Sequence, residues 1–223
     1  MRQQNTKRVT RAATLLVIAA LYGVGSSIRA STPIASGTPV ITVAIDPIAS
    51  GERADYDGDG FDDLVVGSPL ENVAGGTIWW PVSFAGQINV LYGTVSGISS
   101  AGDQAFDMRD VGVSGTPESN DHFGEALASG DFNGDGKSDV AVMYDYGGAN
   151  TAIWMFYGSS TGVIAQPTHK WAGAWFWSHG MPVAGDFNGD GKSDLLAFYD
   201  YENNDSAAWL FPGDGVGGFA MPR

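Results

Sequence analysis

The nine residues DFNGDGKSD occur twice in this chain, at 131–139 and 186–194, and a related segment, DYDGDGFDD, occupies 55–63. The second and third copies extend further, because residues 131–158 and 186–213 align without a gap and share 16 of 28 positions. Self-similarity at such a spacing is typical of proteins built from repeated supersecondary units. The 223 residues are therefore expected to build one small structural unit at least three times.

The repeated segment has the spacing of a cation-binding loop. Side-chain oxygens fall at positions 1, 3, 5 and 9, and glycine stands at position 6. Calcium fits best, because it accepts six to eight oxygens in a flexible geometry, and the carbonyl at position 7 is the expected further ligand. We predict about three calcium ions, one per loop. The predicted ligands are Asp55, Asp57, Asp59, Phe61 and Asp63; Asp131, Asn133, Asp135, Lys137 and Asp139; Asp186, Asn188, Asp190, Lys192 and Asp194.

Two alternatives to this interpretation differ in strength. An EF-hand loop begins in the same way but needs a bidentate Glu at position 12 and a helix on each side. Position 12 is Val66, Val142 or Ala197, and the residues after each last Asp are apolar and typical of strands. The second alternative, that Asp, Asn and Gly only form turns here, stays open.

Composition favours an all-β fold. Hydrophobic residues make up 43% of the chain, aromatic residues 12% and charged residues only 16%, and there are 32 glycines. No long helical periodicity follows residue 30, so many short strands joined by turns are expected.

The first 30 residues differ from the rest. Basic residues precede an apolar run at 12–22, and small residues follow, which is typical of a secretory signal peptide. The run is too short for the roughly 20 apolar residues of a membrane span. We therefore predict a signal peptide at 1–30, a linker at 31–45 and a secreted protein with no membrane span in its mature form.

Removing residues 1–30 makes the protein more acidic. Five of the eleven Lys and Arg but none of the 25 acids lie there, which changes the net charge from −14 to −19. Such a surface repels nucleic acid and attracts cations. Because the chain has no cysteine, disulfides cannot stabilise it outside the cell, and metal ions are the alternative cross-link.

Several segments resemble a known family. These are the Asp loops, Phe123-Gly124 before the second loop, Gly67-Ser68-Pro69 after the first, and the segment GQINVLYG at 86–93. Together they resemble FG-GAP/VCBS repeats, whose members include the calcium-loop blades of the integrin α-subunit β-propeller. The resemblance implies β-propeller-type blades, about three of four strands each, in a partial propeller or one completed by a homo-oligomer. The implied repeats span 46–110, 111–165 and 166–223.

The sequence gives no support for thiol or zinc chemistry. It has no cysteine, and His122, His169 and His179 form no metal-binding pair. The resemblance implies a noncatalytic extracellular module for interaction or adhesion, with a protein or glycan as partner. The alternative is a noncatalytic part of a secreted hydrolase system.

Aromatic residues offer one candidate ligand site. Trp171, Trp175 and Trp177 lie close together in the segment WAGAWFWSHG. Such residues fill the space between propeller blades, and they also form platforms on which sugar rings stack. Packing is the favoured interpretation, and sugar binding is the hypothesis that competes with it.

Overall fold

The computed structural model describes residues 42–44, 54–74, 81–110, 116–146, 150–160, 168–173, 180–201 and 205–222. All of them belong to one compact unit, Ile34–Arg223. The predicted signal peptide at 1–30 lies outside the described residues. Within the described ranges, no helix is long and apolar enough to cross a membrane.

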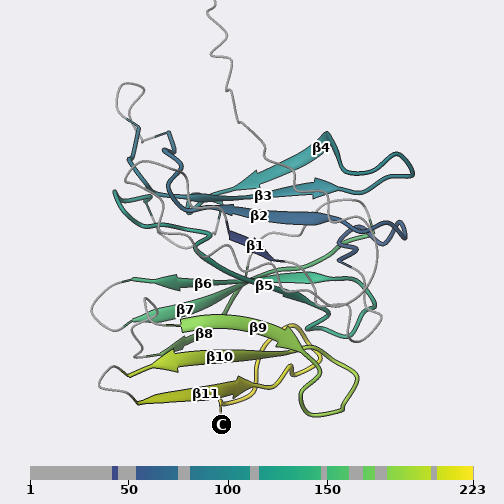
Figure 1. Ribbon diagram of the computed structural model, residues 1–223, viewed down its shortest axis with the longest axis vertical. Coiled ribbons are helices and arrows are strands. Elements are labelled where there is room, and N and C mark those ends of the chain that lie inside the picture. Colours follow the sequence, from purple (N-terminus) through teal and green to yellow (C-terminus); the bar gives the residue numbers. More distant parts are fainter. Residues whose placement is uncertain are drawn as a thin grey trace, which may run out of the picture. The chain divides into compact units, whose positions relative to one another are not determined.

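The described strands form three antiparallel sheets (Figure 1). The first contains β1 (Thr42–Ala44), β2 (Leu64–Ser68), β3 (Gln87–Tyr92) and β4 (Ser99–Phe106). The second contains β5 (Ala126–Gly130), β6 (Asp139–Asp145), β7 (Thr151–Phe156) and β8 (Thr168–Gly173). The third contains β9 (Gly180–Gly185), β10 (Asp194–Asp200) and β11 (Ser206–Phe211). In each sheet the strands pair in chain order.

The sheets pack face to face through two hydrophobic cores. Val140 and Val142 of β6 point into the core shared with the first sheet, and Ala141 and Met143 point into the core shared with the third. Because both faces of the second sheet are covered, β6 and β7 are almost continuously buried. In the first sheet, β2 and β3 alternate between buried and half-buried positions, as expected for strands with one covered face.

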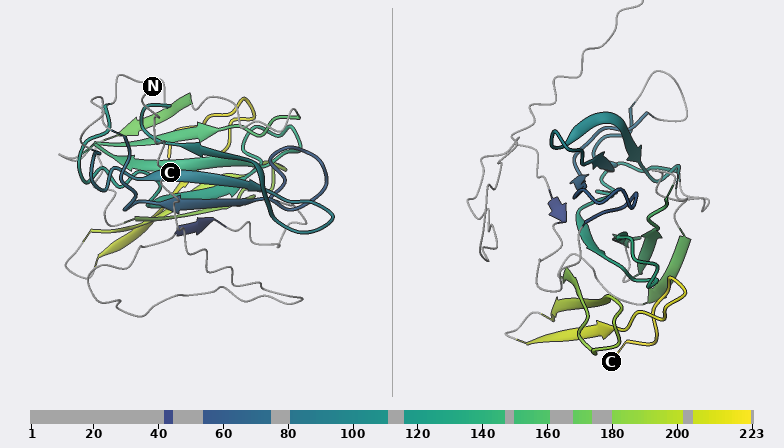
Figure 2. Two further views of the ribbon diagram at one scale, coloured as in Figure 1. Left: turned by 90° about the horizontal axis from the view of Figure 1, so that it is seen from above. Right: turned by 90° about the vertical axis from the view of Figure 1, so that its right-hand side faces the viewer.

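The first strands of successive sheets lie beside one another. Strand β5 contacts both β1 and β9. In the right-hand view of Figure 2, the first, second and third sheets follow one another in chain order. Four-stranded meanders arranged in this way are the blades of a β-propeller. The prediction of an all-β fold with propeller-type blades is therefore confirmed.

The sheets do not begin and end where the predicted repeats do. Strand β1 lies at Thr42–Ala44, inside the segment 31–45 assigned as a linker. Strand β8 pairs with β7 but lies beyond residue 165, where the second repeat was expected to end. The first and fourth strands of a sheet lack the Asp motif, so their positions are harder to predict from the sequence.

Candidate metal sites

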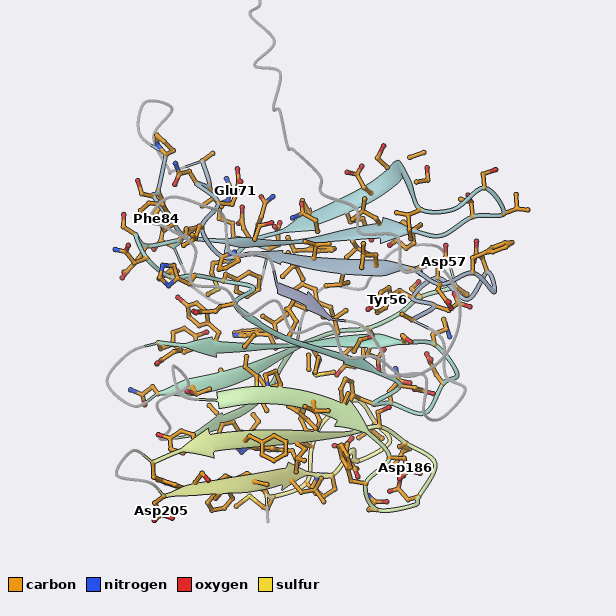
Figure 3. The ribbon with its side chains drawn as sticks, in the orientation of Figure 1. Tyr56, Asp57, Glu71, Phe84, Asp186 and Asp205 are labelled. Carbon is orange, nitrogen blue, oxygen red and sulfur yellow. The ribbon has the colours of Figure 1, made fainter. Side chains whose placement is uncertain are left out.

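Each Asp loop immediately precedes the second strand of its sheet, β2, β6 or β10. In Figure 3, Asp57 and Asp186 lie at the same end of the strands, whereas Phe84 and Asp205 lie at the opposite end. The glycines at positions 4 and 6 allow the tight turn: Gly58 and Gly60 have φ of 76° and 90°, and their equivalents in the other loops are similar. The prediction that strands, not helices, follow the loops is confirmed.

The first Asp of each loop organises the turn by accepting backbone hydrogen bonds. Asp55 Oδ1 accepts from the N–H groups of Gly58 at 2.6 Å and Asp59 at 3.1 Å, and Oδ2 accepts from Gly60 at 2.9 Å. Asp131 and Asp186 accept the same three bonds in their loops. This arrangement holds the carboxylate inside the turn, where it is able to face a bound cation.

The last Asp of each loop joins the loop to the end of the third strand. Asp63 accepts from Tyr56 N–H at the start of the loop and from Gly93 N–H just after β3, both at 2.7 Å. Asp139 accepts likewise from Gly158, and Asp194 from Gly213. Sequence reasoning gave these aspartates a ligand role only. The glycine that ends each aligned repeat was the available signal for their second role.

Burial raises the pKa of these last aspartates. Asp139 is fully buried, and desolvation raises its pKa to about 7, although hydrogen bonds from backbone N–H groups oppose the shift. Desolvation raises the pKa of Asp63 to about 6 and also raises that of Asp194. In contrast, backbone hydrogen bonds lower the pKa of the exposed Asp186. The buried carboxylates are therefore the groups for which a nearby cation would change the charge state most.

The oxygens of the first loop fit a calcium ion. One carboxylate oxygen from each of Asp55, Asp57 and Asp63 lies within 4.8 Å of the other two. Ligands held about 2.3–2.6 Å from one ion are separated by at most about 5 Å, so the observed spacing suits a shared calcium. Hard carboxylate oxygens are also the donors that calcium prefers.

The three loops differ in charge. Asn133 and Asn188 replace Asp57 at position 3. Lys137 Nζ lies 3.1 Å from Asp135, and Lys192 Nζ lies 2.8 Å from Asp190. Phe61 takes the lysine position in the first loop. The second and third loops thus contain an internal cation beside position 5.

Consecutive loops are also connected to each other. Ser138 N–H of the second loop donates to the Asp55 carbonyl at 3.0 Å, and Ser193 N–H of the third donates to the Asp131 carbonyl at 2.9 Å. A backbone hydrogen bond therefore links each of these loops to the loop before it.

The tryptophans divide between described and undescribed residues. Trp171 lies in β8, is half-buried and packs edge-on against Phe211 of the third sheet, with ring centroids 5.1 Å apart. This contact favours the packing interpretation for Trp171. Trp175 and Trp177 lie outside the described residues.

Comparison with known proteins gives matches to a repeat family in both halves of the chain. Residues 50–79 match the FG-GAP repeat, and residues 131–197 match an FG-GAP-like repeat. Integrin alpha-7 of Mus musculus is 30% identical over 165 residues, which are 67% of this chain and 13% of that protein.

Two further relatives cover similar parts of the chain. Integrin alpha-8 of Homo sapiens is 28% identical over 179 residues, 76% of this chain and 15% of that protein. Phosphatidylinositol-glycan-specific phospholipase D of Rattus norvegicus is 31% identical over 152 residues, 64% of this chain and 17% of that protein. The chain thus spans only a small part of the length of the relatives it matches.

Proposed function

Because this chain is an FG-GAP repeat protein of integrin-α type, we propose that it is a secreted, calcium-binding, noncatalytic module for interaction or adhesion outside the cell. The observation that carries the calcium assignment is the threefold recurrence of one loop geometry, with the same carboxylate hydrogen bonds at the first and last Asp. In the first loop, carboxylate oxygens of Asp55, Asp57 and Asp63 also converge within 4.8 Å, which a turn alone does not need.

The proposed ligands are the side-chain oxygens at positions 1, 3, 5 and 9 of each loop, with the carbonyls of Phe61, Lys137 and Lys192. A bound calcium ion would supply positive charge among carboxylates that otherwise repel one another. The residues themselves do the remaining work: the first Asp shapes the turn, and the last Asp ties it to the glycine after the third strand. Calcium would therefore stabilise the connection between loop and sheet.

Calorimetric titration of the full chain with calcium tests this proposal. We expect about three ions to bind, and magnesium to bind more weakly because it requires a tighter octahedral geometry. The variants Asp55→Ala, Asp131→Ala and Asp186→Ala should each remove about one ion. Absence of calcium binding by the wild-type chain would refute the assignment.

The proposed partner is an extracellular protein or a glycan. The strongly acidic chain is poorly suited to nucleic acid, and residues 1–30 are proposed to direct its secretion. Trp175 and Trp177 remain candidates for stacking on a sugar, with Trp171 limited by its packing role. Glycan and cell-surface protein arrays, probed with and without calcium, test this part, and a lack of binding in both conditions would count against it.

The match to a phospholipase D favours a second candidate, a noncatalytic part of a secreted hydrolase system. This role predicts that the chain binds a hydrolase and changes its activity, whereas the first role predicts partner binding without one. Co-purification from the medium of the native host, followed by hydrolase assays on the complex, distinguishes the two. Hydrolysis by the chain alone would refute both.

A further inference from the structure

Three aromatic residues occupy equivalent positions in the loops but differ in burial. Tyr56 and Phe132, at position 2 of the first and second loops, are fully buried. Tyr56 packs in the core between the first two sheets, and Phe132 in the core between the second and third. Phe187, the equivalent residue of the third loop, is 47% exposed. Each position-2 aromatic thus packs against the following sheet where the described residues include one.

The same contrast extends over one face of the third sheet. Ala141 and Met143 of β6 are buried against the third sheet. Their equivalents in β10 are Leu196, which is half-buried, and Phe198, which is 50% exposed. We define the open face of the third sheet as Phe187, Leu196, Phe198, Ala208 and Leu210.

Among the described residues, the first sheet has a face that no other sheet covers, on the side where a preceding sheet would lie; the apolar residues of its strands there are half-buried. Val65 of β2 and Val90 of β3 point toward the second sheet, so alternation directs their neighbours to the other side. We define the open face of the first sheet as Phe61, Leu64, Val66 and Leu91. In the second and third sheets, the equivalent face receives the preceding sheet.

The contacts between loops show the same difference: positions that are in contact between consecutive sheets lack a described partner loop at the first and third sheets. Lys137 lies against Gly58 of the preceding loop, and Lys192 lies against Gly134, since a Cβ on either glycine would meet the lysine side chain at 3.4 Å. Phe61 takes the lysine position in the first loop and is 40% exposed. Around Gly189 of the third loop, a Cβ would meet no described atom within 4 Å.

We propose that the open face of the third sheet docks onto the open face of the first sheet of a second copy of this chain, reproducing the contact between consecutive sheets. Phe187 would enter the core so formed, and Phe61 of the second copy would lie against Gly189. Two copies would close into a ring of six sheets, within the range of four to eight blades typical of propellers.

The order of side chains along the two faces supports this pairing. On the third sheet, Leu196 pairs with Leu210 near the loop end, Phe198 pairs with Ala208, and Ser206 lies at the far end. On the first sheet, Leu64 pairs with Leu91 near the loop end, Val66 pairs with the half-buried Asn89, and Ser68 pairs with Gln87 at the far end. Both faces therefore change from apolar to polar in the same direction, as in-register docking requires.

Light-scattering mass measurement over a concentration series, on the full chain in millimolar calcium, tests the proposal. We expect a dimer, and we expect Phe198→Asp and Phe61→Asp each to weaken it at least ~10-fold, as loss of a buried aromatic anchor does at other interfaces. Val95→Asp, at a turn residue outside both faces that is 86% exposed, is the matched control and should leave the mass unchanged. Circular dichroism of each variant checks that it folds.

Mixing the two variants separates this contact from other modes of association. Phe198→Asp keeps the open face of the first sheet, and Phe61→Asp keeps that of the third, so the mixture should regain one intact contact and form heterodimers. A symmetric contact between two third sheets would leave Phe61→Asp dimeric. That result, a monomeric wild-type chain, or an oligomer unaffected by both variants would overturn the proposal.

Discussion

Gly67 and Gly124 pack so closely that a Cβ on Gly67 would lie 2.0 Å from the Gly124 carbonyl oxygen. Gly67 belongs to β2, whereas Gly124 follows Phe123 at the start of the next sheet, with φ of 88°. The Phe-Gly pair of one repeat therefore contacts the Gly-Ser-Pro segment of the repeat before it. Two motif fragments that are distant in sequence form one contact between sheets.

Gly67→Ala should destabilise the protein by about 2–4 kcal/mol, because the added methyl group meets backbone that cannot move aside without separating the sheets. Gly185→Ala is the matched control, since the three atoms nearest to its Cβ would all belong to the Phe187 ring, the first at 3.2 Å, and that ring is partly exposed. Urea unfolding of both variants measures the difference. Equal midpoints would contradict the packing argument.

Asp139 should contribute to stability even without calcium. It accepts hydrogen bonds from the N–H groups of Phe132, Asn133 and Gly158 in a fully buried position. Asp139→Ala removes the acceptor of the Asn133 and Gly158 N–H groups, whereas Phe132 N–H keeps its bond to the Gly130 carbonyl, and the loss should cost about 3 kcal/mol. Asp135→Ala removes a more exposed position-5 carboxylate and should cost about 0–1 kcal/mol in EGTA. A comparable loss in both variants would mean that the last Asp has no special structural role.

The sequence alone predicted the loops and the strands that follow them, because the ligand spacing and the apolar run after each last Asp are local signals. It could not predict the environment of identical segments. DFNGDGKSD occurs at both 131–139 and 186–194, yet Phe132 is fully buried and Phe187 is 47% exposed. Their burial depends on the next sheet. Strand β8 is a separate case, because THKWAG lacks a clear strand pattern of its own and pairs with β7.

The pH dependence of stability should reverse when calcium is added. Burial raises the pKa of Asp139 to about 7, against 3.8 for an ordinary Asp, so the folded carboxyl holds its proton more tightly than the unfolded one. The part of its contribution to apo stability that depends on protonation is therefore fully present below about pH 4 and is lost as pH rises toward about 7. Calcium requires the ionised form, so calcium stabilisation should grow over the same range.

Melting temperatures from pH 5 to 8, in EGTA and in calcium, measure these opposite slopes. Asp139→Asn should flatten the part of both slopes that this carboxyl causes. Identical slopes with and without calcium would show that the buried carboxylates and the ion are not coupled.

Trp171→Ala should lower stability by about 2 kcal/mol through loss of its contact with Phe211, because half-buried aromatic residues contribute less than fully buried ones. Trp171→Phe keeps an aromatic ring and should recover part of the loss. Thermal unfolding measures the stability of both variants. Their binding to any glycan found by array screening tests the alternative role of Trp171 in ligand binding. Unchanged stability with loss of glycan binding would favour the ligand role instead.

The first loop should bind calcium more tightly than the third, because it has Asp57 at position 3 and no lysine beside position 5, whereas Lys192 lies 2.8 Å from Asp190. Asp57→Asn should therefore weaken the tightest site, by roughly 10-fold for one lost carboxylate charge. Lys192→Met removes the competing cation and retains the alkyl chain near Gly134, so it should strengthen the third site. Calorimetric titration resolves the sites by affinity, with Asp62→Asn as a control outside the predicted ligand set. If Asp57→Asn leaves the tightest site unchanged, charge at position 3 does not set the order of binding.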